Sequence, residues 1–142
     1  MCLWIKDREL RVATKDIPVL KRLSLFRKDW YRIESCTPVQ GMYTGTLSEL
    51  KGKEIEPIKP YDLDKLKVDI ENPDNNTLRG GLIHAHTEFR AVPIPGDVVF
   101  EAVIPKGAHY VVGAYHDIAA ERIIIKKIPW WNIIKQLIKR QI

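Results

Sequence analysis

The chain has 142 residues, of which 45% are hydrophobic and 29% are charged. This balance is typical of a folded globular protein and excludes a disordered, collagen-like or membrane-spanning class. The length predicts a single domain over residues 1–142, and a net charge of +5 that is mostly scattered along the chain does not favour nucleic acid as a partner.

The opening segment and the cysteines predict a cytoplasmic protein. Lys6 follows the start too soon for the apolar stretch of a signal peptide, and no apolar run reaches the roughly 18 residues of a membrane-spanning helix. Cys2 and Cys36 are too few for a disulfide framework or a structural zinc site, so we interpret both as free thiols. No cofactor is predicted.

The first half of the chain predicts short extended segments separated by prolines. Residues 17–26 alternate between two faces and predict a strand, with a short helix as the alternative. Further extended segments are expected at residues 30–36 and 53–58, the second with Ile55 facing inward.

A short helix and a loop are expected next. Residues 61–70 place Leu63, Leu66 and Ile70 on one side of a helix. Residues 71–81 are dense in Asn, Asp, Pro and Gly, which predicts a turn-rich loop.

Residues 82–87 alternate and predict a strand with Ile83 and Ala85 facing the core. The opposite face is expected to hold Leu82, His84 and His86.

A hairpin is predicted after a loop at residues 89–96. Residues 98–104 are apolar on both faces, which is typical of a central strand. Residues 105–108 (PKGA) predict a turn, and residues 109–112 are expected to return as the partner strand. This register opposes Glu101 to Val112 and places Glu101 and His109 on different faces.

The chain ends with a predicted strand at residues 122–128 and a helix that Pro129 opens. Its apolar face is expected to comprise Trp130, Ile133, Ile134, Leu137, Ile138 and Ile142. We therefore predict an α+β fold, in which an antiparallel sheet of short strands with Pro- and Gly-rich loops is covered by a C-terminal amphipathic helix.

Four segments, at residues 1–19, 36–41, 79–89 and 99–113, resemble a family of small proteins of Bacteroides-type bacteria with distant relatives in phage genomes. The motifs that carry the resemblance are Gly-Gly-x-x-His and Ile-Pro-Lys-Gly. The family pattern also has three tyrosine-containing motifs, at which this chain carries Leu20, Val39 and Ile118-Ala119-Ala120. The resemblance implies the fold and a link to phage or mobile elements, and it implies no activity.

His84 and His86 are the candidate metal ligands. Alternation places both imidazoles on one strand face, about 7 Å apart, and imidazoles suit Fe, Mn, Zn or Ni. With Glu88 and with His109 after its Pro-x-Gly turn, they are similar to the ligand set of cupins, although the carboxylate and His109 come earlier than in that family. The alternative is a pair of exposed histidines.

Glu101 and Lys21 are the candidate catalytic residues. A glutamate inside an apolar strand is costly unless it is paired, and a buried carboxyl with a shifted pKa is common in active sites. Residues 101–107 are similar to the catalytic-glutamate strand of ADP-ribosyltransferases, in which a first-strand arginine grips NAD; here that strand offers Lys21-Arg22. The family's Ser-Thr-Ser motif is missing, and the alternative is a glutamate paired with a cation across the sheet.

The C-terminal helix combines Trp130 and Trp131 with five Lys or Arg residues from Lys126 onward. A basic amphipathic helix with tryptophans can lie in a membrane interface or bind a partner. The favoured interpretation is that its apolar face covers the sheet while the cations stay solvated.

The leading hypothesis is a non-catalytic binding or accessory module with an unknown protein partner. The alternative is an enzyme with a site around Lys21, His84, His86 and Glu101, either ADP-ribosyltransferase-like or metal-dependent. Neither the oligomeric state nor the substrate is indicated by the sequence.

Overall fold

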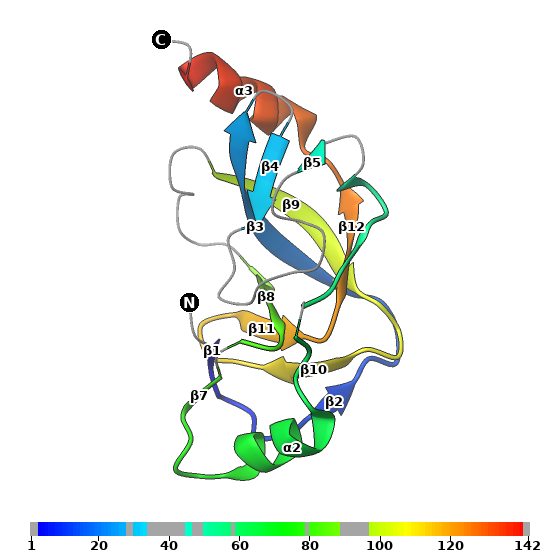
Figure 1. Ribbon diagram of the computed structural model, residues 1–142, viewed down its shortest axis with the longest axis vertical. Coiled ribbons are helices and arrows are strands. Elements are labelled where there is room, and N and C mark those ends of the chain that lie inside the picture. Colours follow the sequence, from blue (N-terminus) through cyan, green and yellow to red (C-terminus); the bar gives the residue numbers. More distant parts are fainter. Residues whose placement is uncertain are drawn as a thin grey trace.

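A computed structural model describes residues 3–27, 30–33, 45–46, 50–57, 59–78, 80–88 and 97–140. Together they form a mixed fold of short antiparallel strands and two helices, as the sequence predicts (Figure 1). The strands are β1 (Leu3–Trp4), β2 (Arg11–Val12), β3 (Ile17–Arg27), β4 (Trp30–Ile33), β5 (Gly45–Thr46), β6 (Glu54–Ile55), β7 (Thr77–Leu78), β8 (Ile83–His86), β9 (Asp97–Ile104), β10 (His109–Val112), β11 (Asp117–Ala120) and β12 (Ile123–Lys127). The helices are α2 (Leu63–Glu71) and α3 (Trp130–Arg140).

The main sheet is built around β3. Its strand order is β2-β10-β11-β8-β3-β9-β12-β6, with β4 paired to β3 and β5 paired to β4. β9 pairs along most of one edge of β3, from Ile17 opposite Ile104 to Ser24 opposite Asp97. The strand predicted over residues 17–26 is therefore confirmed, its helix alternative is wrong, and β9 is the central strand that its apolar faces predict.

The other edge of β3 is divided between two strands. β8 meets it at one position, where Leu20 lies opposite His86, and β4 pairs with it from Leu23 onward. β8 and β4 thus occupy successive parts of the same edge, and Lys21 and Arg22 lie between them.

The predicted hairpin after β9 is half right. The turn forms, with the Ala108 amide donating to the Pro105 carbonyl over 3.1 Å and Gly107 at a φ of 90°. However, β10 pairs with β2 and β11, not with β9. The N-terminal segment takes the position beside the turn, because Ala13 exchanges backbone hydrogen bonds with Gly107 and Ala108. The predicted register of Glu101 with Val112 is therefore wrong.

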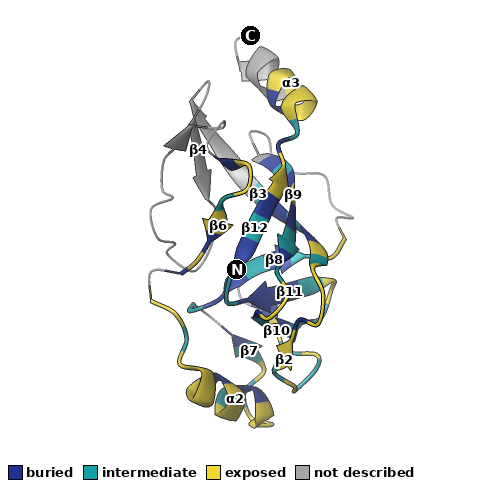
Figure 2. Ribbon diagram, turned by 90° about the vertical axis from the view of Figure 1, so that its right-hand side faces the viewer, coloured by how far each residue is buried: buried dark blue, intermediate teal, exposed yellow. Residues whose placement is uncertain are grey.

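The larger hydrophobic cluster lies on one face of the main sheet. Ile83 and Ala85 of β8 enter it as predicted, together with Phe100 at the centre of β9. Ile55, predicted to face inward, is also fully buried here. Figure 2 shows the buried residues following the strands through the middle of the molecule.

A smaller cluster covers the opposite face of the sheet at its β10–β11 end. Leu66 and Ile70 of α2 pack there against Leu82 and the small sheet of β1 and β7. The Asp62 side chain caps α2 by accepting from the amides of Asp64 and Lys65. The helix is confirmed, but Leu63 is exposed, and the pairing of β7 with β1 was not foreseen within the predicted loop.

α3 begins after Pro129 as predicted and lies at the end of the molecule opposite α2 (Figure 1). Ile133 is buried in the larger cluster, whereas Trp130 and Ile134 are exposed. The expectation that the apolar face covers the sheet thus holds for Ile133 and is wrong for the other two described residues of that face. Neither helix of the described part has the length and apolar content to cross a bilayer.

Several sequence predictions fall on residues outside the described ones. They concern Cys2, residues 34–40 with Cys36 and Val39, the loop at 89–96, and the side chains of Leu137, Ile138 and Ile142.

Candidate functional site

β8 places the two candidate metal ligands on one face of the main sheet. His84 and His86 alternate with the buried Ile83 and Ala85, and both histidines are partly buried. The shared face is the one that the sequence predicts, and it is opposite the larger hydrophobic cluster.

Lys21 joins this group through the backbone. Its side chain is only 4% exposed, and its Nζ donates to the carbonyl oxygen of His84 over 2.6 Å. The described pairing of β3 with β8 is limited to Leu20 and His86. Lys21 therefore supplies a side-chain donor to β8 just past the point where the two strands diverge.

His84 is held neutral. Burial lowers the pKa of its imidazole to about 4, and the nearby ammonium of Lys21 contributes in the same direction. Its Nε2 is buried and has no hydrogen-bond partner among the described residues. A neutral imidazole with this pKa is a weak base near pH 7, and it can donate one hydrogen bond through one ring nitrogen and accept a bond or ligate a metal through the other.

His86 is paired with an aspartate that the sequence analysis missed. Its Nδ1 lies 2.8 Å from Oδ1 of Asp117, which is directly opposite it in the register of β8 and β11. Burial lowers the pKa of His86, and the Asp117 carboxylate opposes that shift. An aspartate bonded to Nδ1 fixes the orientation of the imidazole, as in many histidine–carboxylate pairs.

Asp117 was missed because β11 lacks a recognisable turn before it. The Asp117 amide donates to the Ala114 carbonyl over 3.1 Å, and the two residues between, Tyr115 and His116, have φ of 59° and 62°. Positive φ at both central positions is the signature of a type I′ hairpin turn, which normally carries Asn-Gly. Because Tyr115 and His116 stand where Asn-Gly is usual, the residue types did not indicate a hairpin at this position.

Glu101 lies in the same row as His86 but does not contact it. Cross-strand register aligns five residues over five strands, namely Asp117, His86, Leu20, Glu101 and Lys127. Leu20 separates His86 from Glu101 by two strand spacings, or about 10 Å. Glu101 is exposed and Lys127 lies opposite it, so the expected burial of this carboxyl is wrong.

His109 belongs to a different contact. Its backbone amide and its Nδ1 both lie 2.5 Å from Oε2 of Glu121, and the whole of β11 separates β10 from β8. Within the described part of the chain, no three His, Cys, Asp or Glu residues are grouped to hold a metal ion. Among the described residues, His84 and His86 therefore have no third side chain of these types close enough to complete a metal site.

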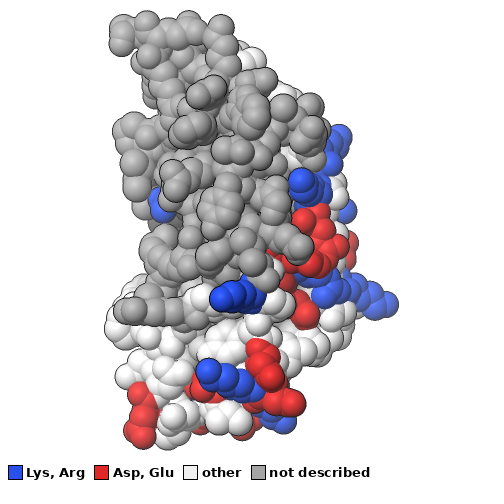
Figure 3. Space-filling view, viewed as in Figure 1, with Lys and Arg blue, Asp and Glu red and all other residues white. Residues whose placement is uncertain are grey.

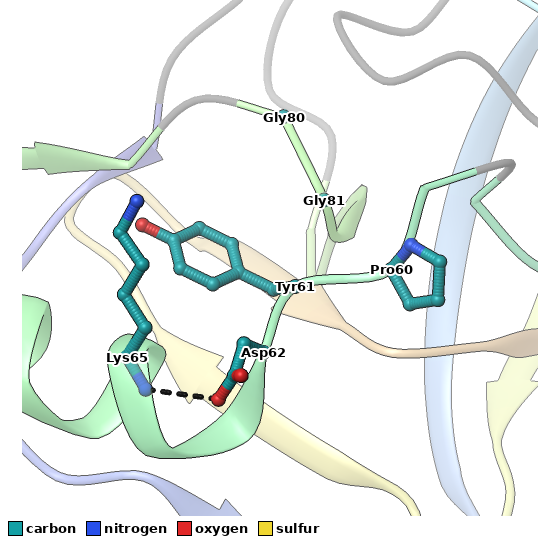
Figure 4. A pocket seen from close by; sticks show the side chains of 6 residues that line it. All are labelled: Pro60, Tyr61, Asp62, Lys65, Gly80 and Gly81. Atoms are coloured by element: carbon teal, nitrogen blue, oxygen red, sulfur yellow. Dashed lines mark hydrogen bonds between the residues drawn. The ribbon is translucent and has the colours of Figure 1, made fainter.

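A shallow depression of about 420 Å³ lies at the start of α2. Figure 4 shows Lys65 extended alongside the ring of Tyr61, below Gly80 and Gly81. The Tyr61 hydroxyl bonds to Asp69, and burial raises its pKa to about 12. Because the first helix amides are already occupied by Asp62, this depression does not offer the usual anion site of a helix N-terminus.

Comparisons of the chain with protein-family models, with curated proteins and with solved structures gave no match. The resemblances to a Bacteroides-type family, to cupins and to ADP-ribosyltransferases accordingly remain predictions.

Proposed function

We propose that this chain is a non-catalytic, cytoplasmic binding module that attaches to its partner through α3. The carrying observation is a group of exposed apolar side chains at one end of the molecule, Trp130, Trp131 and Ile134. Single exposed apolar residues are normal on protein surfaces, whereas a contiguous group marks an interaction site. The link to phage or mobile elements rests on the resemblance and is part of the same proposal.

The surroundings of the candidate catalytic groups support a structural role for them. Lys21 holds the backbone of β8, His86 is bonded to Asp117, and Glu101 is an exposed side chain with Lys127 opposite it in the strand register. The apolar Leu20 lies between the imidazole and the carboxylate that an enzyme would need together. The family pattern carries a tyrosine at this position, and this chain does not.

The alternative function is an ADP-ribosyltransferase-like or metal-dependent enzyme. It is favoured by one arrangement, the buried ammonium of Lys21 beside the neutral His84 and the oriented His86. Perturbed titratable groups of this kind are enriched at active sites, although structural networks also produce them.

The deciding experiment measures nicotinamide release from NAD by the purified chain and by Glu101→Gln and Lys21→Met. We expect no release above the level of the two variants. Release that Glu101→Gln abolishes and that an exposed control, Glu56→Gln, retains would overturn the non-catalytic assignment.

A parallel measurement concerns the metal-dependent alternative. The content of Fe, Mn, Zn and Ni per chain is compared between the native protein, His84→Gln and the exposed-site control His116→Gln. We expect equal, substoichiometric contents. One metal per chain that disappears in His84→Gln alone would instead establish a metal site at His84 and favour the metal-dependent alternative.

A further inference from the structure

The apolar arc of α3 is wider than its contact with the sheet. At 100° per residue, Ile133 lies at one margin of the arc, and Trp130, Ile134 and Trp131 follow it in order around the helix. Ile133 is 1% exposed, whereas these three are 50%, 45% and 67% exposed. Figure 2 shows the first turn of α3 in the yellow of exposed residues, so most of the described apolar arc is not covered by the sheet.

Lysines predominate at the margin of this surface, where Glu101 lies opposite one of them, Lys127. Lys126, Lys127 and Lys135 are exposed, and the Lys135 Nζ lies 5.3 Å from the centre of the Trp131 ring. Residues 123–142 contain five Lys or Arg and neither Asp nor Glu. Around α2 the signs are mixed, and Figure 3 shows acidic and basic side chains together on the described surface there.

We propose that α3 and the adjoining lysines dock on the surface of an anionic phospholipid membrane. This inference rests on the proposed binding function and names its partner. A short helix with tryptophan and isoleucine on one side and lysines at its margin matches the boundary between acyl chains and headgroups. Tryptophan rings prefer that depth, while lysines extend their ammonium groups to the lipid phosphates.

Charge complementarity favours this partner over two others. A second copy would bring the same basic margin against itself, which is unfavourable. A nucleic acid would satisfy the lysines and could stack on a tryptophan, but it would leave the exposed Ile134 without an apolar contact. A lipid surface accommodates all three kinds of side chain.

The test is co-sedimentation of the full chain with phosphatidylcholine vesicles that do or do not contain phosphatidylglycerol. We expect binding to the anionic vesicles, weaker binding at high salt because the lysine contribution is screened, and little binding to phosphatidylcholine alone. Absence of binding to the anionic vesicles, or equal binding to both, would overturn the proposal.

Paired variants locate the surface. Trp131→Ala should weaken vesicle binding about tenfold or more, the effect of losing a buried aromatic ring. Trp4→Ala removes an exposed tryptophan from β1 and should change vesicle binding less than about twofold if α3 is the contact. Equal effects of the two variants would rule out α3 as the site.

The charge is tested in the same way. Lys126→Gln with Lys127→Gln should weaken binding about fivefold for each lysine in contact. The control, Lys65→Gln with Lys67→Gln, removes the same charge from exposed positions on α2, at the end of the molecule opposite α3, and should leave binding nearly unchanged.

Two further outcomes would assign another partner. Tighter binding of a short DNA duplex than of the anionic vesicles would favour nucleic acid, and a concentration-dependent dimer that Trp131→Ala abolishes would favour a second copy. Failure of vesicle binding leaves the nicotinamide and metal results standing, so it is distinguishable from failure of the non-catalytic assignment.

Discussion

The Nζ of Lys21 donates to the carbonyl oxygen of His84 across the point where β8 diverges from β3. A buried ammonium is costly unless it is hydrogen-bonded, and a sheet carbonyl without a donor is costly too. This contact gives the carbonyl a donor and the ammonium an acceptor, and it ties β8 to the centre of the sheet.

Lys21→Met should reveal the strength of this contact. Methionine keeps the length of the side chain, but it leaves the His84 carbonyl without its donor, so we expect a loss of about 1–3 kcal/mol in the free energy of unfolding. Urea denaturation measures it. The exposed control Lys106→Met should stay within about 0.5 kcal/mol of the native protein, and an equal loss in the control would disprove the assignment.

The neutral His84 predicts a pH dependence of stability. Its pKa is about 4 in the fold and about 6.5 in the unfolded chain. Between these values the unfolded state binds more protons, so the contribution is complete above pH 6.5 and is lost as the pH falls toward 4. Its size is at most about 3 kcal/mol.

The measurement is the difference in unfolding free energy between pH 7 and pH 4.5 for the native chain and for His84→Gln. We expect the difference to shrink in His84→Gln and to persist in His116→Gln, whose imidazole is exposed. An unchanged difference in His84→Gln would mean that other groups produce the loss.

The two glycines of the Gly-Gly-x-x-His motif have different roles. Both have positive φ, 55° at Gly80 and 75° at Gly81, but a Cβ on Gly81 would lie 2.7 Å from Cδ2 of Tyr61, while one on Gly80 meets nothing within 4 Å. Gly80→Ala should lower the free energy of unfolding by roughly 1–2 kcal/mol through backbone strain. Gly81→Ala should lower it by about 1–3 kcal/mol more, because the Tyr61 ring must move. Thermal unfolding of the two variants measures both losses.

The fold was predictable where a local pattern decides the structure. β8, β9, α2 and the turn at Gly107 follow from alternation, helical spacing and turn chemistry within a few residues. The strands that pair with β10 were not predictable, because turn chemistry fixes a reversal of the chain but not which strand pairs after it. The partners are β2 and β11, and β2 is remote from β10 in sequence.

The candidate site was predictable in part for the same reason. Alternation correctly puts His84 and His86 on one face, whereas the row from Asp117 to Lys127 depends on four registers between distant strands. Sequence reasoning treated Glu101 as a buried carboxylate because its neighbours are apolar. It had no means of foreseeing that this face of β9 is exposed at Glu101.

The turn between β10 and β11 predicts a stabilising substitution. Tyr115 and His116 adopt positive φ, a conformation that is unfavourable for side chains of their size. Tyr115→Asn with His116→Gly supplies the residues that a type I′ turn prefers. We therefore expect the free energy of unfolding, measured by thermal denaturation, to rise by roughly 1 kcal/mol. A loss of stability would show that the Tyr115 or His116 side chain makes a compensating contact.

The division of β3 between early and late partners has a consequence for synthesis. An 11-residue strand near the start of this sequence pairs with β9, which begins only at Asp97. While the ribosome makes the intervening segments, β4 can already pair with the end of β3, but the edge that β9 later covers exposes unpaired amide and carbonyl groups that other chains can join. The middle of the sheet is therefore completed late, and nascent chains of this protein should depend on chaperones until β9 has emerged.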